Sequence, residues 1–124
     1  MKFTFFVLAL AVFCFSSSLA QSQPGGYQST PIDLENQEQL AILNFGLQEA
    51  VQDAIGDGKL AEGNWTIEAT NSLETQVVEG TNYEWSIDIT NGEGQIVPLD
   101  FIVYVALDNT MSLVSYNILL TQQQ

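Results

Sequence analysis

The side chains of this 124-residue chain that could carry out acid–base chemistry are almost all carboxylates. Fifteen Asp and Glu residues stand against two basic residues, and histidine is absent. The chain therefore cannot form a Ser-His or Cys-His catalytic pair or a histidine-based metal site, and we expect no metal or cofactor. Paired carboxylates can hydrolyse glycosides, but so short a chain leaves little room for the deep cleft that a sugar requires. The composition argues against an enzyme.

A second pattern, Gln76-Val77-Val78-Glu79-Gly80, would act by binding. Apolar residues alternate with polar ones on both sides of it, at Trp65, Ile67, Ala69 and Leu73 before it and at Tyr83, Trp85, Ile87 and Ile89 after it. The alternation predicts two antiparallel strands with a hairpin tip near Gly80, and places both tryptophans in the core. Val77 and Val78 are then either the last core residues of a strand or a surface that a partner covers.

Continued to Tyr83, this segment resembles the Gln-x-Val-x-Gly loop of the cystatins, inhibitors of papain-like cysteine proteases in which Thr-Asn-Tyr often follows. Without disulfides, the chain is most similar to the stefin and phytocystatin types. The resemblance implies a reversible, tight-binding inhibitor of cathepsin L- or cathepsin B-like proteases. It assigns protease binding to Gln76, Val77, Val78, Glu79 and Gly80.

Two further segments extend the resemblance. Pro24, Gly25 and Gly26 are similar to the glycine-containing trunk that precedes the first strand of cystatins, where a missing side chain lets two backbones approach closely. Many cystatins carry Pro-Trp in a second hairpin loop, and Ala106, Leu107 and Asp108 occupy that position here. Because Leu buries less area than Trp, we expect this loop to bind more weakly.

The N-terminus reads as a secretory signal peptide over residues 1–20. Lys2 precedes an apolar run to Phe15, and Ser18 and Ala20 form a small-x-small cleavage site. The only cysteine, Cys14, lies inside it, so residues 21–124 would form a single domain without disulfides. We expect a secreted, endolysosomal or vacuolar protein.

The charge limits the partners. After signal cleavage Lys59 is the only basic side chain against fifteen carboxylates, so nucleic acids and anionic membranes are poor partners. The same charge would attract a basic protein surface. We expect a monomer, with exchange of the hairpin around Gln76–Gly80 as a route to a dimer.

The remaining pattern predicts the elements. A helix is expected from an Asp33 N-cap to about Ile55, ended by Gly56 and Gly58. Its predicted buried stripe consists of Leu40, Leu43, Leu47, Val51 and Ala54 or Ile55, and Ala50 widens it. Gly46 would let a sheet approach closely. Ile42 and Phe45 lie off the stripe, so either the helix is apolar on two sides or its register is wrong.

A short strand is expected at residues 27–32, and two strands follow the first hairpin. One runs from Ile96 to Leu107 and the other has Val114, Tyr116, Ile118 and Leu120 on one face. This order predicts an α+β fold, a four- to five-stranded antiparallel sheet wrapped around one long helix, as in the cystatins. The alternative function is a secreted binding module of the same fold that does not inhibit, suggested by the missing Pro-Trp pair.

Overall fold

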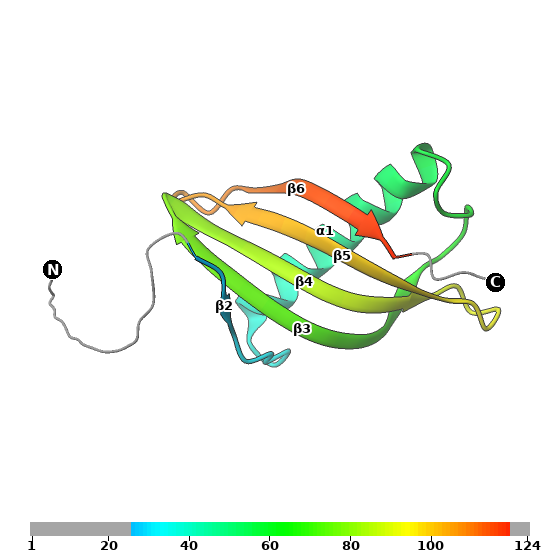
Figure 1. Ribbon diagram of the computed structural model, residues 1–124, viewed down its shortest axis with the longest axis horizontal. Coiled ribbons are helices and arrows are strands. Elements are labelled where there is room, and N and C mark those ends of the chain that lie inside the picture. The colour runs from blue at the N-terminus through cyan, green and yellow to red at the C-terminus, as the bar shows by residue number, and fades with distance from the viewer. Residues whose placement is uncertain (1–25, 120–124) are drawn as a thin grey trace, which may run out of the picture.

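The computed structural model describes residues 26–119, as one helix and five strands (Figure 1). In chain order they are β2 (Gln28–Ser29), α1 (Gln37–Gly56), β3 (Thr66–Val78), β4 (Gly80–Thr90), β5 (Ile96–Val105) and β6 (Met111–Ile118). The strands form one antiparallel sheet in the order β2-β3-β4-β5-β6, and α1 crosses one face of it. The predicted α+β architecture is confirmed.

The predicted signal peptide, residues 1–20, and Leu120 lie outside the described residues. Among residues 26–119, no helix combines the length and hydropathy needed to cross a bilayer.

The core lies between α1 and the inner face of the sheet. Alternate residues of the two central strands are buried there: Trp85, Ile87, Ile89, Val97, Leu99, Phe101, Val103 and Val105. Trp65 also belongs to this core and donates its Nε1–H to the Ala61 carbonyl oxygen at 2.9 Å. The predicted core positions of both tryptophans are therefore confirmed.

Helix α1 begins later than predicted. The N-cap is Asn36, whose Oδ1 accepts a hydrogen bond from the Gln39 amide at 3.0 Å. Asp33, the predicted cap, instead accepts from the Glu35 amide at 3.1 Å, in the turn before the helix. This prediction was wrong because either side chain can accept a bond from the backbone nearby. The C-terminal end at Gly56 agrees with the prediction.

The buried face of α1 is rotated from the predicted stripe. Leu40 is 38% exposed and Leu47 is half-buried, whereas Ile42 and Leu43 are fully buried with three small residues, Gly46, Ala50 and Ala54. The predicted stripe is therefore confirmed at Leu43, Ala50 and Ala54, was wrong at Leu40, and omitted Ile42. A Cβ on Gly46 would lie 2.1 Å from Phe101 Cε1, so the predicted close approach of helix and sheet at Gly46 is confirmed.

Irregular pairing shifts the faces of two strands. In β3, breaks in register between Ile67 and Ala69 and between Thr70 and Ser72 place Thr70 opposite Ile87 and Ala69 opposite Asp88. Ala69 therefore leaves the inner face on which the alternation placed it. A bulge adds one residue to one strand and thereby reverses the faces that follow.

A break in register also changes which residues of β6 face the core. Val103 pairs with Leu113 and Ile102 with Ser115, which leaves Val114 unpaired and 57% exposed. Val114 was predicted to share a face with Tyr116; the inner face instead carries Leu113. Two other strands are shorter than expected, since β2 covers only Gln28–Ser29 and β5 ends at Val105.

Candidate binding edge

Three segments that lie far apart in the sequence meet at one end of the sheet (Figure 1). The β3–β4 and β5–β6 turns lie side by side there, because Thr81 at the start of β4 pairs with Val105 at the end of β5. Strand β2 starts at the same end. We call this the loop edge, and it contains the described residues Gly26, Gln76–Gly80 and Ala106–Asp108. Pro24 and Gly25, also predicted to bind, lie outside the described residues.

The first tip exposes two apolar side chains. Val77 and Val78 end β3, and Val78 pairs with Gly80, so Glu79 alone forms the turn. Val77 is 69% and Val78 46% exposed, which excludes the interpretation that they are the last core residues of the strand. Branched apolar side chains exposed at a rigid tip are typical of a surface that a partner covers.

The position of Gly80 requires glycine. Its φ is +102°, and a Cβ would lie 2.6 Å from the Val105 carbonyl oxygen and 2.7 Å from Tyr104 Oη. Tyr104 Oη donates a hydrogen bond to the Glu79 carbonyl oxygen. A side chain of β5 thus holds the tip of the neighbouring hairpin.

Gln76 is oriented at the base of the same tip. Its Oε1 accepts a hydrogen bond from Asn82 Nδ2 at 2.9 Å, across the pair that these two residues form in the sheet. Gln76 and Asn82, both in the segment that resembles the cystatin loop, therefore contact each other and fix the hairpin below the two valines.

The second tip is built around a tight turn. The Ala106 amide donates to the Thr110 carbonyl oxygen and the Asn109 amide to that of Ala106, both at 2.9 Å. Asn109 has a φ of +72°, which Asn tolerates better than most residues. Leu107 projects from the turn and is 80% exposed, the largest value among the exposed large apolar side chains.

Asp108 stabilises this turn. Its Oδ1 accepts hydrogen bonds from Thr110 Oγ1 at 2.7 Å and from the Thr110 amide at 3.1 Å. These bonds hold the pKa of the Asp108 carboxyl below its ordinary value. Asp108 and Glu79 place two carboxyl groups at the loop edge, next to its apolar side chains.

The N-terminal segment runs beside the first tip. Gln28 pairs with Thr75 and Ser29 with Glu74, and the Thr30 amide donates to the Leu73 carbonyl oxygen at 2.9 Å. Two further residues in the same register would place Gly26 opposite Val77. Strand β2 therefore runs beside the part of β3 that leads to the exposed valines.

Sequence reasoning missed Tyr104 as a residue of this edge. It lies on the outer face of β5, one residue before the strand ends, and the alternation of that strand gave it no role at the edge. An outward-facing aromatic at the end of a strand, next to a glycine in the neighbouring strand, is the signal that could have identified it.

Carboxylates do gather on the outer face of the sheet, as paired-carboxylate chemistry would need. Glu74 lies opposite Glu84, and burial, Glu74 and Asp100 raise the pKa of the Glu84 carboxyl. The cavity beside Glu84 and Asp100 has a volume of about 150 Å³, well below the roughly 300 Å³ at which ligand pockets begin. Within the described part of the chain, no group of three or more His, Cys, Asp or Glu residues could hold a metal ion.

Comparison with known proteins supports the fold. No family model matches the chain, and no curated protein matches it significantly. Among solved structures it is similar to a salivary cystatin from the soft tick Ornithodoros moubata, with 23% sequence identity and a TM-score of 0.53. The match covers 77% of this chain and 98% of the tick protein. The single helix and five-stranded antiparallel sheet are those of the cystatin-like fold.

Proposed function

We propose that this protein is a reversible, tight-binding inhibitor of papain-like cysteine proteases, and that the loop edge fills their active-site cleft. The observation that carries the proposal is the exposure of Val77, Val78 and Leu107 at the tips of two adjacent hairpins. The match of the first tip to the Gln-x-Val-x-Gly motif and the cystatin-like fold support the same function. Cathepsin L- and cathepsin B-like enzymes are the proposed partners.

Inhibition of this kind needs no chemical step from the inhibitor. The loop edge occupies the cleft and excludes substrate, and no peptide bond of the edge is presented to the catalytic thiol at attack distance. The tips are held by strand pairing and by the Tyr104–Glu79 hydrogen bond, so little conformational entropy is lost on binding. Val77, Val78 and the backbone of residues 25–26 would carry most of the affinity.

The proposed environment is the secretory pathway, with secretion or delivery to an acidic compartment where such proteases act. The predicted signal peptide supports it, and the similar tick protein is described as salivary. The protein would act as a monomer after removal of residues 1–20.

The decisive measurement is the residual activity of papain and cathepsin L titrated with residues 21–124. We expect tight inhibition, weakened at least about 100-fold by Val77→Asp or Val78→Asp, because each variant would bury a carboxylate in an apolar cleft. Val114→Asp is the matched control. Val114 lies in β6, outside the loop edge, and its exposure of 57% falls between those of Val77 and Val78. Equal inhibition by all four proteins would rule out the loop edge as the inhibitory surface.

The second candidate is a cystatin-fold binding module without inhibitory activity. The observation that favours it is Leu107, which offers less contact area than the Trp found in many cystatins. Deletion of residues 21–26 separates the two candidates. Loss of papain binding on deletion supports the inhibitor, whereas a folded protein that does not bind papain in either form supports the module.

A further inference from the structure

A groove lies between the first half of α1 and the end of the β5–β6 hairpin, next to the loop edge. It has a volume of about 280 Å³ and is lined by Glu38, Ala41, Ile42, Val105, Asn109 and Met111. Asn109 lies in the same turn as Leu107, so a partner seated on the loop edge would come within reach of the groove.

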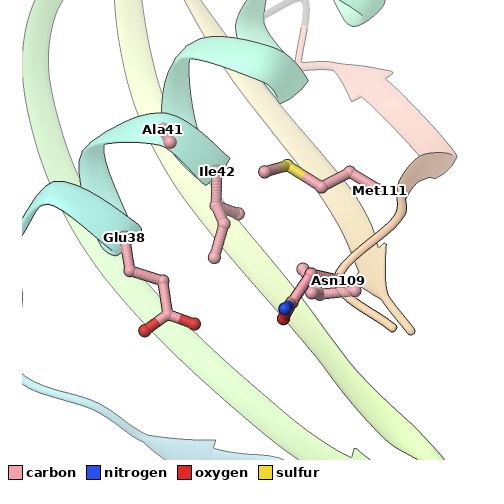
Figure 2. A pocket seen from close by; sticks show the side chains of 6 residues that line it. Glu38, Ala41, Ile42, Asn109 and Met111 are labelled. Atoms are coloured by element: carbon pink, nitrogen blue, oxygen red, sulfur yellow. The ribbon is translucent and has the colours of Figure 1, made fainter. Parts of the chain in front are cut away.

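The groove combines an apolar floor with oxygen acceptors. Ile42 and Val105 are buried beneath it, and Met111, a side chain that adapts to varied shapes, closes one wall. Figure 2 shows Glu38 on the α1 side of the groove and Asn109 on the side of the β5–β6 turn, with the Ile42 side chain between them. Burial and the charge of Glu38 raise the pKa of Tyr83, so the field of this carboxylate acts on the neighbouring sheet.

The rest of the described chain supplies no cation for Glu38. Lys59 is the only basic residue within 26–119, and its Nζ lies 5.4 Å from the centroid of the Tyr116 ring. Tyr116 donates a hydrogen bond to Asp57, just beyond the C-terminal end of α1, whereas Glu38 lies in the first turn of that helix. The formal net charge of −13 attracts basic partners in general.

We propose that this groove receives one basic side chain, arginine or lysine, from a partner protein bound at the loop edge. The volume is below that of typical small-molecule pockets but suits a single side chain. The aliphatic stem would lie on Ile42, Val105 and Met111, and the charged head would reach the oxygens of Glu38 and Asn109. The identity of the partner rests on the proposed function, but the chemistry of the groove does not.

The test is a titration of the isotopically labelled protein with N-acetyl-arginine-N-methylamide and N-acetyl-lysine-N-methylamide, followed by backbone NMR shifts. We expect millimolar binding, with shifts concentrated at residues 38–42 and 105–111. The uncharged norleucine analogue should bind at least fivefold more weakly. Raising the salt from low to near-molar concentration should weaken binding, because a partly exposed ion pair is screened.

Two groove variants and one control make the result specific. Glu38→Gln should weaken binding at least fivefold, and Ala41→Leu should abolish it by filling the groove. Glu62→Gln changes the same charge in the exposed loop between α1 and β3 and should change binding less than twofold. Shifts that are absent, spread over the surface, or unchanged in Glu38→Gln would overturn the proposal. No protease is used, so failure of the groove and failure of inhibition are separate results.

Discussion

At the scale of single residues, Tyr104 and Gly80 fix the conformation of the first tip of the loop edge. The glycine provides the positive φ and the space, and the tyrosine hydroxyl bonds the carbonyl oxygen of the residue at the tip. Neither side chain belongs to the apolar surface itself. They position Val77 and Val78, the side chains that would contact a bound partner.

Tyr104→Phe should therefore loosen the first tip while leaving the fold intact. A single solvent-accessible hydrogen bond contributes about 0.5–1.5 kcal/mol, so the Tm should fall by only a few degrees. Hydrogen exchange of the amides at residues 78–81 should accelerate severalfold, because the tip then opens more often. Tyr83→Phe, in the adjacent strand but away from the tip, is the control. Unchanged exchange at 78–81 in Tyr104→Phe would show that strand pairing alone holds the tip.

Glu84 is the residue at which a pH dependence of stability is expected. Its pKa is raised by burial and by the Glu74 and Asp100 charges, and Asp100 Oδ1 is itself buried without a hydrogen-bond partner among the described residues. A carboxyl whose pKa is raised in the folded state destabilises that state when it is ionised. The penalty is present near pH 7 and is relieved as the pH falls toward the ordinary Glu value of about 4.3.

Glu84→Gln should accordingly raise the Tm at pH 7, and the gain should shrink as the pH approaches 4. Thermal unfolding of the unmodified protein and of Glu84→Gln between pH 4 and pH 8 measures this gain in Tm. Glu62→Gln makes the same change of net charge on an exposed loop, so its effect is subtracted as the general contribution of charge. A gain that is independent of pH would contradict the electrostatic explanation.

At the scale of elements, the contact between α1 and the sheet depends on small residues. Gly46, Ala50 and Ala54 face the sheet, and large side chains occupy the flanks of that stripe. The predicted stripe included Ala50 and Ala54 but was centred on the larger Leu and Val side chains, which is why it contained the exposed Leu40 and omitted Ile42. Ile42 belongs to the core because the true centre of the face lies beside it.

Gly46→Ala should destabilise the protein although alanine is the better helix former. The added methyl would overlap the Phe101 ring, and overpacking costs about 1–3 kcal/mol against a propensity gain of about 1 kcal/mol. We therefore expect a net loss of up to about 2 kcal/mol in the free energy of unfolding by denaturant. Gly56→Ala, where nothing lies within 4 Å of the new methyl, should be neutral or slightly stabilising. Equal effects of the two variants would indicate that α1 moves away from β5 without cost.

The sequence could predict the buried face of some strands but not of others. Strand β4 has an uninterrupted period of two and pairs without a break with β5, and its buried residues were identified correctly. Strands β3 and β6 contain breaks in register, which reverse the face of Ala69 and expose Val114. No single residue type marks these bulges, so periodicity alone could not find them.

At the scale of the whole molecule, the position of the loop edge follows from the order of the strands in the sheet. In an antiparallel meander alternate turns lie at the same end, so the order of elements predicts that the turns after β3 and after β5 are neighbours. The sequence could therefore place Gln76–Gly80 beside Ala106–Asp108. It could not predict the Tyr104–Glu79 bond or the groove at Glu38, because both depend on how side chains from different elements meet.

The scarcity of basic residues has a consequence for cleavage by one class of protease. Proteases of the trypsin type cut after Lys or Arg, and residues 26–119 contain one such position, Lys59. The Lys59 amide donates to the Ala54 carbonyl oxygen at 2.8 Å, and Leu60 beyond it is only 8% exposed, so cleavage there requires local opening of the loop. The described part of the chain should therefore resist cleavage by proteases of the trypsin type.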